Sequence, residues 1–280
     1  MVLMLAVKSR LTRAYALSSL LAVLLLVSSI GGLLYGGRGL YDSYPASLAG
    51  LVGQDAMTLL VGVPLLALSV WLAARGSTRG LLLWAGLLFY FGYSYFFYVV
   101  GGFNALFLVY IAIVSAALYG LLSVLFAIDS EALGDRFGAG TPARSGGAFL
   151  IGISALFIFM WGGMSLSSAA AGTRPDEVLR EVVIIDCVVL LPLLFFGGIR
   201  LWRRETWGYI LGGVLLVKAL ATGSTLAFTT ALGAWWAGRI DGFNAFLFVL
   251  FAIMAAGALA LLIPYLRSVE EGGRRGTDLR

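Results

Sequence analysis

Apolar runs of about twenty residues recur along the whole chain, and they constrain its fold more than any other feature of the sequence. Each run is long enough to cross the ~30 Å hydrocarbon core of a bilayer as a helix. Of the 280 residues, 61% are hydrophobic and only 12% are charged, about half the charged fraction of a soluble domain. The sequence therefore predicts an all-α, polytopic integral membrane protein.

The runs predict eight transmembrane helices. Lys8, Arg10 and Arg13 precede the first run, as in a signal peptide, but the run is longer than a signal peptide's apolar region and no small-residue cleavage site follows it. We therefore expect the first run to remain as a helix. The predicted spans are residues 14–36, 54–74, 80–101, 103–128, 147–171, 182–202, 206–234 and 243–266.

Lysine and arginine are distributed unevenly between the two sets of connecting segments. With the N-terminus inside, fourteen lie on the cytoplasmic side and four, Arg38, Arg174, Arg180 and Arg239, on the outer side. Because cytoplasmic loops carry the excess of positive charge, both termini are predicted in the cytoplasm and the protein in a prokaryotic cytoplasmic membrane. The net charge of +5 does not predict nucleic-acid binding, because no basic stretch is interleaved with exposed aromatic residues.

The two halves of the sequence resemble each other. Residues 102–122 and 242–262 match at about half their positions and both begin with GFNA. Two helices rich in leucine and alanine can look alike by chance, but GFNA at the same point of both halves argues against chance. The spacing of Pro64 and Arg75 also equals that of Pro192 and Arg203.

This similarity predicts two tandem four-helix repeats. Because each repeat contains an even number of spans, the repeats are expected to be parallel, related by an axis along the membrane normal. The predicted organisation is a first repeat at 1–128, a cytoplasmic linker at 129–146, a second repeat at 147–266 and a charged cytoplasmic tail at 267–280.

Several kinds of chemistry are excluded by composition. The chain has no histidine, which rules out histidine-ligated haem, histidine-based zinc sites and a histidine general base. Its single cysteine, Cys187, excludes a disulfide or a CxxC pair within one chain. Nothing resembles a nucleotide-binding loop or a hydrolase elbow. We expect no metal, no cofactor and no catalytic residue.

Lys218 is the most unusual residue, because it lies about a dozen residues into the seventh span. At 1.5 Å per residue it stands roughly 18–20 Å above the cytoplasmic end, too deep for a lysine to reach water. An ionisable residue at that depth points to a functional site. Thr222, Thr225 and Thr229 follow on the same helical face. The alternative reading of this stripe is a seam for packing against another helix.

Two carboxylates accompany this lysine. Asp186 lies in the outer part of the sixth span, and Lys218 is the only cation available to it at membrane depth, so we expect the two to face each other. Asp55 is placed at the outer start of the second span. There the helix dipole favours a carboxylate, which is the structural alternative to a binding role.

Aromatic and amide side chains complete the candidate set. Tyr90 and Tyr93 share a face of the third span and predict either an interfacial aromatic belt or an aromatic-lined pocket. Asn104 and Asn244 begin the fourth and eighth spans at equivalent positions, where an asparagine caps a helix or contacts a ligand. The predicted substrate-binding residues are Lys218, Asp186, Thr222, Thr225, Tyr90, Tyr93, Asp55, Asn104 and Asn244.

Three functions fit these features. We favour a secondary transporter or exporter of a small or amphiphilic molecule, with a site between the two repeats. The alternative is a lipid-binding or accessory membrane subunit that acts through a partner. An intramembrane enzyme is the least favoured. The expected partners are membrane lipids, a small-molecule or lipid substrate, and either further copies of the chain or a partner subunit.

Overall fold

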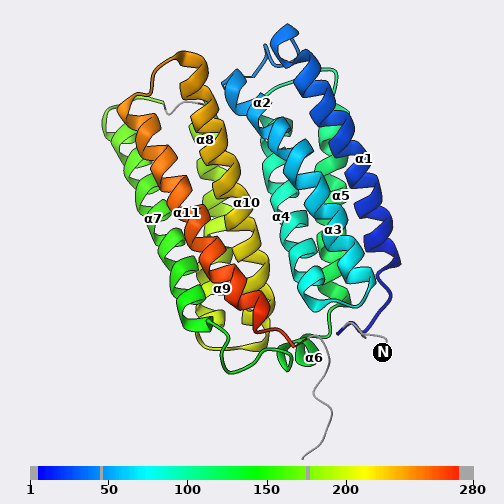
Figure 1. Cartoon of the computed structure of the whole chain (residues 1–280). Helices are drawn as coiled ribbons and strands as arrows, with labels where there is room; N and C mark the ends of the chain where they lie inside the picture. Colours follow the sequence, from blue (N-terminus) through cyan, green and yellow to red (C-terminus); the bar gives the residue numbers. More distant parts are fainter. Residues whose placement is uncertain (1–5, 45–46, 175–176, 271–280) are drawn as a thin grey trace, which may run out of the picture.

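A computed structural model describes residues 6–44, 47–174 and 177–270, and these residues form a bundle of helices without strands (Figure 1). Eight helices are long and apolar enough to span a membrane, in the order and near the positions predicted, which confirms a multi-pass membrane protein. The elements are α1 (Thr12–Tyr35), α2 (Leu48–Met57), α3 (Val63–Ala74), α4 (Thr78–Val100), α5 (Phe107–Ala127), the short α6 (Ser130–Gly134), α7 (Ala143–Ala170), α8 (Glu177–Ile185), α9 (Leu191–Trp202), α10 (Thr206–Ala237) and α11 (Gly242–Arg267).

Two spans change helical type part-way through the membrane. A π-helical turn at Thr58–Gly62 joins α2 to α3, and a second at Asp186–Leu190 joins α8 to α9. Each turn is followed by a proline at the second residue of the next helix, Pro64 or Pro192. Proline has no backbone N–H to donate, so a local change of hydrogen bonding just before it is expected. Such π turns occur often at functional sites.

Short polar side chains set several helix starts. The side chains of Ser47 and Ser77 accept hydrogen bonds from the backbone N–H groups of Gly50 and Gly80. These bonds satisfy N–H groups that the first turn leaves unpaired. Because Ser47 caps α2, the second span begins at Leu48, six residues before the predicted start.

The centre of the bundle is built from α4 and α10. Of their most apolar stretches, 61% and 67% are buried, against 17% for α7 and for α11. The two helices pack against each other, and α10 also packs against α2, α9 and α11. The close approach of α4 and α10 depends on Gly86, where a Cβ atom would lie 2.6 Å from the Cγ1 of Val217. The side chains of α10 are therefore the most buried among the eight spans.

The outer helices are arranged differently on the two sides of this pair. α1 packs mainly against α5, whereas α7 packs mainly against α9 and makes few contacts with α11. In Figure 1 α7 lies at the edge of the bundle away from α1, with α11 between it and α10.

Both described ends of the chain lie at the α6 end of the bundle (Figure 1). The backbone N–H groups of Lys8 and Asp129 donate to the carbonyls of Ala127 and Ala6. At the other end of the connection, the N–H of Glu270 donates to the carbonyl of Arg136 at 2.8 Å. Residues 127–141 therefore hold both described chain ends, and we call this arrangement the clamp.

Candidate functional site

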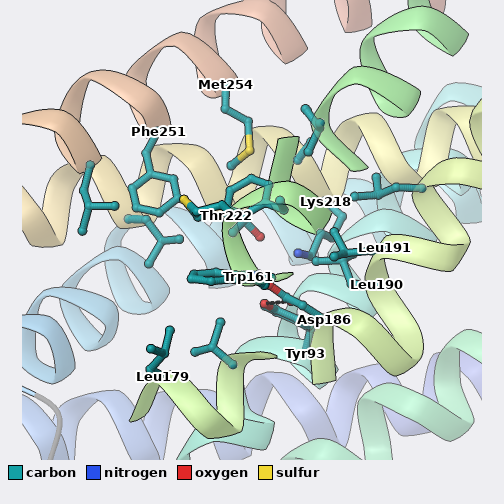
Figure 2. A pocket seen from close by; sticks show the side chains of 18 of the residues that line it. Tyr93, Trp161, Leu179, Asp186, Leu190, Leu191, Lys218, Thr222, Phe251 and Met254 are labelled. Atoms are coloured by element: carbon teal, nitrogen blue, oxygen red, sulfur yellow. Dashed lines mark hydrogen bonds between the residues drawn. The ribbon is translucent and has the colours of Figure 1, made fainter. Parts of the chain in front are cut away.

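A cavity of about 530 Å³ lies between α7, α8, α10 and α11 (Figure 2). Its volume falls in the range of small-molecule sites. The walls are mostly aliphatic, aromatic and thioether side chains, and Phe243, which is exposed in the first turn of α11, lines its edge. Tyr93 on α4 also lines the cavity. The cavity therefore belongs largely to the second half of the chain rather than lying midway between the halves.

Asp186 sits at the first residue of the second π turn and is buried. Its Oδ1 accepts a hydrogen bond of 2.6 Å from the Tyr93 hydroxyl, and its Oδ2 accepts one of 2.8 Å from Trp161 Nε1. Figure 2 shows these side chains meeting from three elements, α4, α7 and the π turn. Both carboxylate oxygens are thus held by neutral donors.

Lys218, also buried, lines the same cavity from α10. Its Nζ lies 3.7 Å from the centroid of the Tyr93 ring, in a cation–π contact. The predicted approach of Lys218 and Asp186 takes the form of a bridge through Tyr93, whose ring faces the amine and whose hydroxyl binds the carboxylate. The structure shows no direct ion pair between the two among the residues it describes.

The threonines on one face of α10 line different cavities. Thr222 lines the main cavity, and its Oγ1 is buried without a hydrogen-bond partner. Thr225 instead binds the Tyr90 hydroxyl at 2.8 Å, and Gln54 Nε2 donates to the same hydroxyl at 3.0 Å. Tyr90 and Thr225 line a second cavity, of about 250 Å³. Neither Tyr90 nor Thr225 lines the main cavity.

A third cavity, of about 240 Å³, lies where α2, α4, α8 and α10 come together. It shares Tyr93 and Thr222 with the main cavity, and Tyr44 and Tyr98 also line it. Like the second cavity, it is lined by residues from both halves of the chain.

Asp55 does not lie at the start of its helix, as the sequence predicted. It is the eighth residue of α2, which begins at Leu48, and it is completely buried. The Tyr41 hydroxyl donates to its Oδ2, while its Oδ1 has no partner. The placement of Asp55 at the outer start of the second span is therefore wrong, and it lines none of the three cavities described above.

The two asparagines do not occupy equivalent places. Asn104 lies in the turn before α5, where its Oδ1 accepts from the N–H of Leu106 and its Nδ2 donates to the carbonyl of Leu40. Asn244 lies in the first turn of α11 and donates to Asp241, which caps that helix. These bonds, first that from the backbone N–H of Asn244, lower the pKa of Asp241. Neither asparagine lines the main cavity.

Sequence reasoning missed Trp161 and the apolar wall of the cavity. Trp161 lies well inside α7, away from the helix ends where tryptophan usually anchors a span. A buried indole N–H needs an acceptor, so a tryptophan at that depth was a signal for a polar partner. Phe157, Met160, Phe251 and Met254 gave no such signal, because apolar residues on a span face lipid or protein equally well.

Chemically, the arrangement suits binding, because apolar walls surround a few polar groups. Within residues 6–44, 47–174 and 177–270 no group of three or more histidine, cysteine, aspartate or glutamate side chains is placed to hold a metal ion. No protein-family model, curated protein or solved structure matches the chain. The function therefore has to be argued from the cavity itself.

Proposed function

We propose that the protein is a secondary transporter or exporter of a small amphiphilic molecule that binds in the main cavity. The observation that carries the proposal is a cavity with apolar walls and, on one side, a lysine, a carboxylate and a free threonine hydroxyl. Apolar walls bind an alkyl chain or ring, and the polar groups fix the orientation of a head group. A water-soluble solute would leave most of this lining without a matching contact.

The position of the cavity also supports transport. Lys218 and Thr222 lie near the middle of α10, so a bound head group would sit well inside the membrane. The edge of the cavity at Phe243 and the loose contact of α7 with α11 provide a path from the membrane phase. Ionisable groups at this depth that face a cavity are typical of substrate pathways.

The test uses alkyl compounds that carry a permanent charge and therefore cross a bilayer slowly. Dodecyl sulfate and dodecyltrimethylammonium are loaded into proteoliposomes, and their release is followed with the wild type and two variants. Met254→Trp fills the cavity, whereas Leu118→Trp adds the same bulk to α5 at a half-exposed position. We expect release of at least one compound, abolished by the first variant and retained by the second. If proteoliposomes with the wild-type protein release neither compound, the proposal is contradicted.

A lipid-binding accessory subunit is the second candidate function. The apolar walls that fit an amphiphile also fit a resident lipid chain, and no coupling-ion site is evident at the cavity. This alternative predicts that the cavity holds a lipid through purification and that proteoliposomes release neither compound. Mass spectrometry of the purified protein in a non-lipid detergent separates the two cases.

We further propose that the protein is a tandem 4+4 duplication in a prokaryotic cytoplasmic membrane, with the α6 side in the cytoplasm. Support for the duplication comes from the π turn followed by proline in both halves. α1 and α7, the first spans of the two halves, pack against different neighbours, which a duplication with equivalent halves would not predict. In an experimental structure in lipid, residues 14–128 should superpose on 147–266 by rotation about an axis near the membrane normal. An inverted relation would refute the duplication.

A further inference from the structure

Two hydrogen-bond donors on one face of α10 lack an acceptor. Lys218 Nζ contacts the ring of Tyr93, but no acceptor bonds to it in the part of the chain that the structure describes. Thr222, one helical turn further along and 8% exposed, has a buried hydroxyl without a partner. Both side chains line the main cavity. An unpaired charge and an unpaired hydroxyl in a low-dielectric interior are both unfavourable, so a ligand that supplies acceptors is stabilised there.

Asp186 does not supply the missing acceptor. Both of its oxygens already accept hydrogen bonds, from Tyr93 and from Trp161, and these two neutral donors stabilise the carboxylate without removing its charge. The donors of Lys218 and Thr222 remain unused beside it. A cationic head group would bring further donors to a place that lacks acceptors, whereas an anionic one would accept from both Lys218 and Thr222.

We infer that the main cavity binds a single-chain amphiphile with a monoanionic, oxygen-rich head group, held by Lys218 and Thr222. This inference rests on the proposed function and names its substrate class. Lys218 supplies a cationic donor and Thr222 a hydroxyl donor for the oxygens of such a head group. The alkyl chain lies along the apolar wall formed by Phe157, Met160, Phe251 and Met254. Because burial of a methylene contributes about 0.8 kcal/mol, each methylene removed from the chain should weaken binding about four-fold.

The experiment compares head groups on an identical alkyl chain. Purified protein is captured on scintillant beads in a neutral short-chain detergent, and tritiated dodecanoate is displaced by unlabelled dodecanoate, dodecylammonium or dodecanol. We expect dodecanoate to compete about ten-fold or more better than the other two, as hydrogen bonds to a charged group imply. Lysophosphatidylglycerol with the same chain, added in parallel, distinguishes a lipid phosphate from a free carboxylate as the source of the anion.

Variants assign the effect to the two donors. Lys218→Met should weaken dodecanoate binding about ten-fold or more without changing dodecanol binding, and Thr222→Val should weaken dodecanoate binding about three- to ten-fold. Thr230→Val is the control, because Thr230 donates to the carbonyl of Leu226 and does not line the cavity. If dodecylammonium or dodecanol binds as well as dodecanoate, the inference is wrong while the proposed function stands. If none of the three binds, the proposed function fails.

A second inference rests on an independent observation at Asp55. This residue is completely buried, one of its carboxylate oxygens lacks a partner, and the described residues place no cationic side chain in a salt bridge with it. Gly32 packs against it so closely that a Cβ atom there would lie 2.6 Å from Asp55 Cγ, which leaves no room for a metal ion on that side. An isolated carboxylate in such a site is neutralised rather than left charged.

The groups that face this site are hydroxyls from several elements. Tyr41 donates to Asp55 and its ring contacts that of Tyr98, which in turn stacks on Tyr95 and contacts Tyr110. Tyr98 also lines the third cavity, which shares Tyr93 with the main one. The geometry points to Asp55 as a buried proton-binding site.

Infrared spectroscopy tests this directly at neutral pH, because a protonated carboxyl group has a carbonyl stretch that a carboxylate lacks. We expect such a band in the wild type, a shift of the band in heavy water, and its loss in Asp55→Asn. Tyr41→Phe removes a hydrogen bond to the carboxyl group and should shift the band. This variant assigns the band to Asp55 if Asp55→Asn does not fold. A wild-type spectrum without the band, or a band that Asp186→Asn removes instead, overturns the inference.

Discussion

Tyr93 is the residue on which the polar side of the cavity depends. Its hydroxyl holds Asp186 at 2.6 Å and its ring lies under Lys218 at 3.7 Å. A phenol can do both, because its oxygen donates in the ring plane while the face of the ring attracts a cation. The tyrosine thus separates the two charged residues while remaining in contact with each.

Replacing Tyr93 by phenylalanine should isolate the first of these contacts. The ring remains beneath Lys218, but Asp186 loses one of its two donors, so stability should fall by about 1.5–3 kcal/mol, as expected for a hydrogen bond to a charged group. Thermal unfolding of the purified protein measures the change. Tyr119→Phe on the exposed face of α5 is the control and should leave stability unchanged. Equal effects of the two substitutions would contradict the role given to Tyr93.

The sequence located some of these residues and misplaced others for identifiable reasons. Lys218, Asp186, Thr222 and Tyr93 were found because depth and helical spacing can be read along a span, and they line one cavity. Asp55 was misplaced because its helix starts earlier than hydropathy indicates. Tyr90 shares a helical face with Tyr93, yet it binds Thr225, because neighbouring turns of α4 meet different partners. Such partners depend on tertiary packing, which periodicity does not encode.

Among the helices, α10 carries the cavity and joins the two halves. It reaches the first half through α4, where Gly86 lets the backbones approach. The apolar runs identified both helices, but not their central place in the bundle, since a span that faces protein is as apolar as one that faces lipid. The π turns were not foreseen either; the prolines that follow them were the only signal.

Gly86→Ala should weaken the packing of α4 on α10. The new methyl group would lie 2.6 Å from Val217 Cγ1 and 3.0 Å from the carbonyl oxygen of Val214, so we expect a loss of about 1–3 kcal/mol from overpacking. Gly92→Ala in the same helix is the matched control. There the nearest atom, the Cβ of Ala117, is 3.6 Å away, and alanine is the better helix former, so stability should be unchanged or slightly higher. Thermal unfolding of both variants decides between these outcomes.

For the whole molecule, the bias of positive charge gives an orientation that cysteine labelling can check. Cys187 is first replaced by serine, because it is exposed. Cysteines at Ser43 and Ala237 should then react with a membrane-impermeant maleimide in intact cells, and one at Ala139 only after permeabilisation. All three positions are exposed and lie in turns or at helix ends. Labelling of the cysteine at position 139 in intact cells would show that the orientation is the opposite of the one predicted.

The clamp at the α6 end makes the two edges of the bundle mechanically unequal. Backbone hydrogen bonds tie residues 6–8 and 268–270 to the connection between α5 and α7, while at the opposite edge bonds such as that from Asn104 to the Leu40 carbonyl join segments of the same half. Two bodies that are joined at one end separate most widely at the other end. If α7–α11 move against α1–α5, the clamp makes α6 the pivot of that motion. The largest displacement is then expected at the end of the bundle opposite α6.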